Sequence, residues 1–185
     1  MTDARDIDMN DIEGLTEDVS LKKAWHMMRD RGDVTLPVVD QGKLTGIITI
    51  GDIANAYMDV YDNCILSTAK TSYKNILETL DAKMIVGSED GFFESGEVVI
   101  ATANPDVLED YIHPGDMVIL GNRYETQLCA IEMQAACLII SIGCEVSPAI
   151  IQLAEEKNCI ILRTAYDTFI TARLLNQSIP IGYFM

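Results

Sequence analysis

The amino-acid sequence predicts an α/β protein whose sheet is mostly parallel. Strand-like and helix-like segments alternate along its second half, as in folds where helices connect parallel strands. The segment 136–143, ACLIISIG, is apolar apart from one serine, which is typical of a strand buried on both faces. The segment 147–158, SPAIIQLAEEKN, opens with Ser147 and Pro148, residue types that favour the first positions of a helix.

The composition limits the classes of partner. The 185 residues suffice for one or two small domains. A net charge of −16 argues against nonspecific binding to nucleic acid and to anionic membranes, and we interpret it as a solubility feature. The negative net charge is still compatible with a small anionic ligand that backbone N–H groups hold. No apolar run approaches the roughly 20 residues that span a bilayer.

The reactive side chains predict neither catalysis nor a metal centre. His26 and His113 are the only histidines and lie far apart in the sequence. No nucleophile motif, P-loop or Asp-His-His metal motif is present. The cysteines are odd in number and lack CxxC spacing, so we expect buried thiols of a reducing cytoplasm rather than disulfides. They are Cys64, Cys129, Cys137, Cys144 and Cys159.

The first 63 residues predict an α-β-β-α unit, with room for a leading strand. A helix lies between Ser20, a good N-cap, and Gly32, a residue that ends helices. Residues 34–40, VTLPVVD, read as an edge strand or the start of one because of the internal proline. A turn, a strand over 44–50 and a helix over 51–63 follow.

Beyond a polar segment at 61–75, which we interpret as a linker or an extended helix exit, the chain continues with a second α/β unit. Its first segment, 75–87, has a helical half and a strand half. Apolar stretches then alternate with amphipathic ones to the end of the unit. The strands are expected over 97–103, 115–121, 136–143 and 159–165, and the helices over 105–112, 123–134, 147–158 and 166–177.

The strand over 44–50 runs directly into a helix, with Thr49 at its end and Asp52 three residues later. The two side chains could simply cap this helix. They could also bind a ligand, because a helix N-terminus presents free N–H groups to an anion. A hydroxyl suits a phosphate, and a carboxylate can accept hydrogen bonds from a ribose.

The pattern LPVVD, turn, LTGIITIGDI resembles a CBS domain over residues 5 to about 60. In that family the Thr/Ser-x-x-Asp element binds the ribose and phosphate of adenine nucleotides, which implies this role for Thr49 and Asp52. Thr35, Leu36 and Pro37 match the family's wall beside the adenine.

The segments LGNRYETQLCAIE and TAYDTFITARL resemble the DRTGG domain. Its Gly-Asp-Arg element corresponds to Gly121-Asn122-Arg123, and its Thr-Gly-Gly turn to Ser141-Ile142-Gly143, where one glycine is lost. The loss weakens any expectation of phosphate binding at this turn. Asn122, Arg123 and Asp167 could form a site; we favour a structural pair between Arg123 and Asp167.

The domain order resembles the regulatory insert of CBS-containing family II inorganic pyrophosphatases. We expect a CBS-type β-α-β-β-α unit over 1–63, a linker over 64–75 and a DRTGG-type α/β domain over 76–180. Residues 181–185, IGYFM, resemble the start of a second CBS motif that breaks off here. The chain is then a regulatory fragment, not itself an enzyme.

This resemblance implies a module that binds adenine nucleotides and controls a manganese- or cobalt-dependent pyrophosphatase. AMP or ADP would inhibit, and ATP or a diadenosine polyphosphate would activate. The metal and the catalytic domain would lie outside this chain, and one complete CBS motif implies a homodimer. The alternatives are a ligand-free dimerisation module and an accessory region of an acyltransferase-type enzyme.

Overall fold

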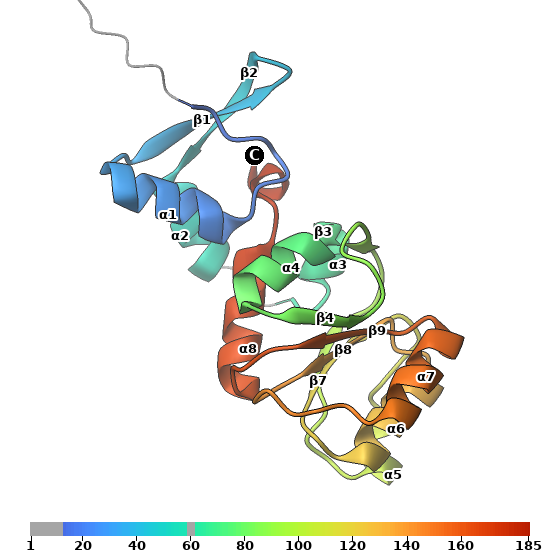
Figure 1. Ribbon diagram of the computed structural model, residues 1–185. Coiled ribbons are helices and arrows are strands. Elements are labelled where there is room, and N and C mark those ends of the chain that lie inside the picture. Colours follow the sequence, from blue (N-terminus) through green and yellow to red (C-terminus); the bar gives the residue numbers. More distant parts are fainter. Residues whose placement is uncertain (1–12, 59–61) are drawn as a thin grey trace, which may run out of the picture.

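The computed structural model describes residues 13–58 and 62–185 (Figure 1). The first unit has the expected α-β-β-α order. The Ser20 hydroxyl accepts a hydrogen bond from the Lys23 N–H at 3.2 Å, and Gly32 ends the first helix with φ +73°, as predicted. The elements are α1 (Leu21–Arg31), β1 (Thr35–Asp40), β2 (Lys43–Thr49) and α2 (Ile50–Met58).

Strands β1 and β2 form an antiparallel hairpin in which Thr35 lies opposite Thr49. Pro37 is tolerated because, within residues 13–58, this sheet consists of β1 and β2, so each strand has an edge. The leading strand of the expected unit is reduced, among the described residues, to a single bridge. Leu15 accepts a hydrogen bond from the Val39 N–H at 2.7 Å and donates one to the Pro37 carbonyl at 2.9 Å.

Residues 64–75, where a linker was predicted, are folded instead. They contain α3 (Ile65–Thr68) and the two-residue strand β3 (Thr71–Ser72), which pairs with β5 (Phe92–Phe93). Ile65 and Leu66 are buried in the core. Their burial outweighs the polar composition of this segment, so it packs rather than remaining extended.

The second unit is built on a five-stranded sheet of order β4-β9-β8-β7-β6. Strands β6 to β9 run parallel, and β4 pairs with β9 in the antiparallel direction at one edge, which confirms a mostly parallel sheet. The strands are β4 (Lys83–Val86), β6 (Val98–Ile100), β7 (Met117–Leu120), β8 (Cys137–Ile140) and β9 (Ile160–Arg163). The helices are α4 (Tyr73–Leu80), α5 (Pro105–Leu108), α6 (Tyr124–Glu132), α7 (Pro148–Lys157) and α8 (Thr168–Leu175).

Helices cover both faces of this sheet, with α5, α6 and α7 on one side and α4 and α8 on the other (Figure 1). The core on the α4 and α8 side continues without interruption into the first unit. Its buried residues include Met28 and Ile48 of the first unit together with Ile76 and Ile139 of the second. The two units therefore share one apolar core.

The C-terminal segment returns to the first unit through the short helices η2 (Asn176–Ser178) and η3 (Ile181–Phe184) (Figure 1). The Leu21 N–H donates to the Ile179 carbonyl at 2.9 Å, and the Ile181 N–H donates to the Val19 carbonyl at 2.8 Å. Residues 181–185 thus begin where the backbone is hydrogen-bonded to the first unit. Their assignment to a second CBS motif stays a prediction.

Candidate functional site

Thr49 and Asp52 form a closed hydrogen-bond pair where β2 passes into α2. The Thr49 N–H and hydroxyl both donate to Asp52 Oδ2, at 2.8 and 2.7 Å. The Asp52 N–H donates to the Thr49 hydroxyl oxygen at 3.2 Å. The capping interpretation is therefore confirmed. The second carboxylate oxygen, Asp52 Oδ1, accepts no hydrogen bond from the described residues, so it can accept one from a sugar hydroxyl.

The three residues expected beside an adenine differ in exposure, because successive side chains of a strand point to opposite faces of the sheet. Thr35 is exposed and lies directly opposite Thr49, and Pro37 is half-buried. Leu36 is fully buried in the core. Its side chain therefore does not face a ligand, and only its backbone remains available for a contact.

Two exposed apolar residues next to this pair were not among the site residues predicted from the sequence. Val34 is 66% exposed and Ile50 is 43% exposed, and the Ile50 N–H donates to the Val34 carbonyl at 3.0 Å. They place apolar surface beside the polar Thr49–Asp52 pair, which is the combination that a nucleoside needs. The only sequence signal was two apolar residues at the ends of the expected strands.

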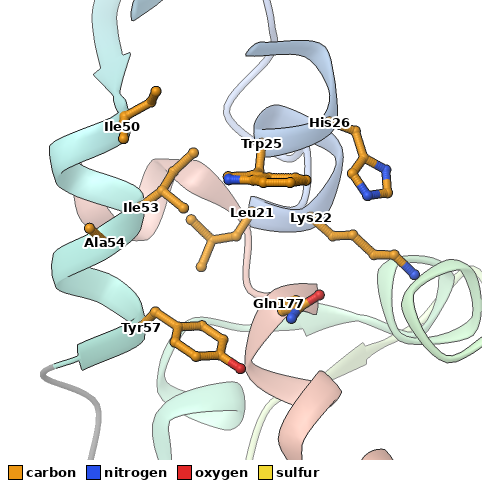
Figure 2. Close-up of a pocket in the computed structure, with 9 residues that line it drawn as sticks. All are labelled: Leu21, Lys22, Trp25, His26, Ile50, Ile53, Ala54, Tyr57 and Gln177. Carbon is orange, nitrogen blue, oxygen red and sulfur yellow. The ribbon is translucent and has the colours of Figure 1, made fainter. Parts of the chain in front are cut away.

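A groove of about 350 Å³ lies between α1 and α2 (Figure 2). The Trp25 indole and the Ile53 side chain point toward one another across it, and Tyr57 lies at its far end. Trp25 is 42% exposed, whereas Leu21, Ala24 and Met28 of the same helix are buried. The groove leaves an apolar surface that none of the described residues covers.

The predicted pair between Arg123 and Asp167 does not form, and this interpretation was wrong. No ion pair between these side chains occurs in the described part of the chain, and both residues are exposed. Asp167 instead caps α8, accepting a hydrogen bond from the Ile170 N–H at 2.8 Å. Arg123 stands at the N-cap position of α6 without a side-chain capping bond, next to the exposed Asn122.

The turn at Ser141-Ile142-Gly143 adopts two successive left-handed conformations, with φ +53° at Ile142 and +65° at Gly143. The Ile142 N–H donates to the Tyr166 carbonyl and the Gly143 N–H to the Thr164 carbonyl, each at 2.8 Å. Because both N–H groups already have partners, this turn offers neither of them to a phosphate.

The described residues contain no group of three or more His, Cys, Asp or Glu side chains placed to hold a metal ion. His26 packs beside Trp25, and the His113 Nδ1 lies 3.8 Å from an Asp116 carboxylate oxygen. None of the helices within 13–58 and 62–185 has the length and apolar character needed to cross a membrane.

Comparison with known proteins agrees with this architecture. Residues 75–178 match the family model of the DRTGG domain, and residues 4–59 match that of the CBS domain. The chain is 38% identical over 181 residues to a cobalt-dependent inorganic pyrophosphatase of Clostridium perfringens. It is 29% identical over 180 residues to a probable manganese-dependent inorganic pyrophosphatase of Thermotoga maritima.

Each alignment covers 97% of this chain but only 33% of the relative, so the chain spans about one third of the length of these pyrophosphatases. A crystal structure of the CBS and DRTGG domains from the regulatory region of Clostridium perfringens pyrophosphatase, complexed with the activator diadenosine tetraphosphate, superposes with a TM-score of 0.92. The sequence identity is 37%, and the match covers 100% of this chain and 81% of the other.

Proposed function

This chain belongs to the DRTGG-domain family, with a CBS domain ahead of its DRTGG domain, and from that premise we propose that it is a regulatory module for an inorganic pyrophosphatase. In this proposal the module binds adenine nucleotides. AMP or ADP inhibits a manganese- or cobalt-dependent catalytic domain, and ATP or a diadenosine polyphosphate activates it. The catalytic domain and its metal lie outside the described residues.

The observation that carries the proposal is the match over the whole chain to a regulatory region crystallised with diadenosine tetraphosphate. The local geometry supports it. Asp52 Oδ1 can accept from a ribose hydroxyl while Oδ2 keeps Thr49 in place. The Thr49 hydroxyl donates its proton to Asp52 and so fixes the start of α2, where the helix dipole favours a phosphate. Val34 and Ile50 add apolar surface for a base.

Regulation would follow from different affinities of a nucleotide for two arrangements of the protein. A nucleotide that binds one arrangement more tightly shifts the population toward it by that ratio of affinities. The apolar core shared by the two units can transmit such a shift. A displacement of α2 would move the residues that pack against it on α4 and the sheet. The Arg173 Nε also donates to the Tyr57 hydroxyl at 3.1 Å, which ties the end of α2 to α8.

CBS motifs bind nucleotides between paired motifs, so we propose that this chain pairs with a second copy of itself. All five cysteines are free thiols, which supports a reducing, cytoplasmic setting. The second candidate function is an assembly module that binds no nucleotide. The groove that contains Trp25 and Tyr57, which no residue of the described ranges covers, favours it, since contiguous exposed apolar surface marks contact sites.

Calorimetric titration with AMP, ADP, ATP and diadenosine tetraphosphate tests the proposal. We expect saturable binding, strongest for diadenosine tetraphosphate, and its loss in Thr49→Val, which removes one hydroxyl but keeps the β-branched shape. Thr45→Val is the matched control, because Thr45 lies on the same strand and is exposed. Thermal melting of each variant verifies its fold. Absence of heat with all four nucleotides would favour the assembly module, and unchanged affinity in Thr49→Val would overturn the site.

A further inference from the structure

Strand β6 forms one edge of the five-stranded sheet, and its outer side has backbone groups to offer. On the inner side, β7 bonds the Glu97 carbonyl at 2.8 Å and the Ala101 N–H at 2.9 Å. Because the backbone groups of successive strand residues alternate in direction, the N–H and C=O of Ile100 point outward. The outward Val98 N–H donates to the Asn63 carbonyl at 3.0 Å, whereas neither Ile100 group has a partner within residues 13–58 and 62–185.

The two edges of this sheet differ in how they are protected against an added strand. At the opposite edge, β4 begins with Lys83 and has a register shift between Met84 and Val86, and both features discourage further pairing. Strand β6 contains neither Lys nor Pro and pairs with β7 in continuous register. Its last residue, Ile100, is 45% exposed. An edge strand of this kind is a template for another strand.

A cavity of about 270 Å³ opens beside this edge, on the side of the sheet that α8 covers. Leu66 of α3, Val98 and Ile100 of β6, and Leu175 of α8 are among the residues that line it. Side chains of a strand point to alternate faces of the sheet, so a strand paired with β6 would place every second side chain over this cavity. A cavity of about 150 Å³ already admits benzene, so this one has room for an apolar side chain.

Acidic side chains stand at the start of the same edge. Glu97 directly precedes β6, and Asp62 lines the cavity; both are exposed. The Asn63 side chain donates to a Glu97 carboxylate oxygen at 2.8 Å, which holds Glu97 beside this segment. The residues that line the cavity include no Lys or Arg in the described part of the chain. Charge complementarity therefore favours an incoming segment that carries a basic residue.

We propose that the outer edge of β6 binds an extended segment of a partner protein, which adds a strand to the sheet. The Ile100 N–H and C=O bond its backbone, one of its apolar side chains enters the cavity, and a Lys or Arg beside it meets Glu97 and Asp62. A second copy of this chain fits this edge poorly, because its net charge is −16 and its own β6 has no basic residue. The surface lies on the second unit and is independent of the proposed nucleotide site.

Amide exchange of the whole chain, followed by NMR, tests the open edge. The Ile100 N–H should exchange rapidly in the free protein, and the Val99 N–H, which faces β7, is the protected reference. The probe is the capped peptide KVKLKVK, which alternates basic and apolar residues. At saturation it should slow exchange at Ile100 at least about tenfold. An Ile100 N–H that is already protected without peptide, or one that stays unprotected with about 1 mM peptide, would overturn the proposal.

A backbone substitution tests the pairing itself. Ile100→Pro removes the outward N–H and leaves the bonds to β7 in place, which an edge strand tolerates. Fluorescence anisotropy of the labelled peptide should show an affinity at least about tenfold lower. Ile100→Thr is the matched control, since it keeps the N–H and the β-branched shape, and it should bind within about threefold of the unaltered chain.

A second peptide separates strand pairing from simple charge attraction. The same KVKLKVK sequence with methyl groups on its backbone nitrogens keeps every charge but cannot donate to a strand, so we expect it not to bind. Equal binding of the two peptides contradicts the proposal, as does an unchanged affinity in Ile100→Pro. Thermal melting verifies the fold of each variant. If Ile100→Pro does not fold, the methylated peptide decides the question on the unaltered chain.

Discussion

The side chain of Asn75 on α4 donates a hydrogen bond to the backbone carbonyl of Asp18, at 2.9 Å, and so connects the second unit to the first. Asn75 is 8% exposed, so the donor side chain of this bond is buried, while Asp18 is exposed. Lys22 adds a second connection, donating from Nζ to the Thr79 carbonyl at 2.8 Å. Together with the shared apolar core, these bonds make the two units one cooperative structure.

Asn75→Ala should lower the free energy of unfolding by about 0.5–1.5 kcal/mol, because the buried Asn75 side chain and its hydrogen bond to the Asp18 carbonyl are lost. Urea denaturation, followed by fluorescence of the single tryptophan in the first unit and by circular dichroism, measures this change. Asn63→Ala is the control. The exposed Asn63 side chain donates to the exposed Glu97 side chain at 2.8 Å, so its truncation should change the free energy by less than about 0.5 kcal/mol. Two separate transitions in the unaltered chain would contradict the shared core.

Ile142→Gly should raise the free energy of unfolding by about 1 kcal/mol, since a left-handed isoleucine costs more than the added freedom of glycine in the unfolded chain. Gly121→Ala is a useful contrast, because Gly121 has open space around it and no positive φ. Denaturant midpoints of the two variants provide the comparison. A clear loss of stability in Ile142→Gly would show that the side chain contributes packing within its own chain.

Two buried thiols predict a loss of stability at alkaline pH. Burial raises the pKa of Cys159 from 9.0 to about 12, and burial together with the neighbouring Cys159 raises the pKa of Cys137 well above 9.0. Above pH 9 the unfolded chain loses these protons while the folded chain keeps them. The stabilisation is therefore complete below pH 9 and is lost as the pH rises toward 12.

Each such thiol should lower the free energy of unfolding by roughly 1 kcal/mol for each pH unit in this range. Cys159→Ser should flatten the dependence when denaturation is repeated from pH 8 to 11, and Cys144→Ser is the matched control. A dependence that is the same in Cys159→Ser and in the unaltered chain would refute the assignment. The same burial predicts slow reaction of Cys137 and Cys159 with a thiol reagent in the native state.

Local sequence patterns predicted most helices and strands. Ser20, Ser147 and Gly32 stand at the helix ends where they were expected, because caps depend on residues close in the sequence. The strands β3 and β5, of two residues each, were missed because so short a segment carries no periodicity. The antiparallel direction of β4 was also not predicted, because the apolar composition of a strand does not reveal the direction in which it pairs.

The nucleotide-binding role of the motif residues stays a prediction, whereas their positions in the fold can be compared with the structure. The motif placed Thr49 and Asp52 together correctly, and the helix start explains their capping contact. It could not show that Leu36 is buried or that Val34 is exposed, because strand orientation depends on what packs against each face. Arg123 and Asp167 were expected to pair. The structure places them at the N-cap positions of two different helices, α6 and α8, where Asp167 caps α8.

The sequence by itself determined the α/β class, the order of the elements, and the CBS and DRTGG resemblance that the family matches confirm. These properties reside in short-range spacing, which needs no knowledge of the fold. Only the tertiary structure decided that the two units share one core, that residues 64–75 pack rather than link, and that Ile142 stands exposed between Arg123 and Asp167. These relationships join residues far apart in the sequence, and burial and chain geometry, not local pattern, determine which of them meet.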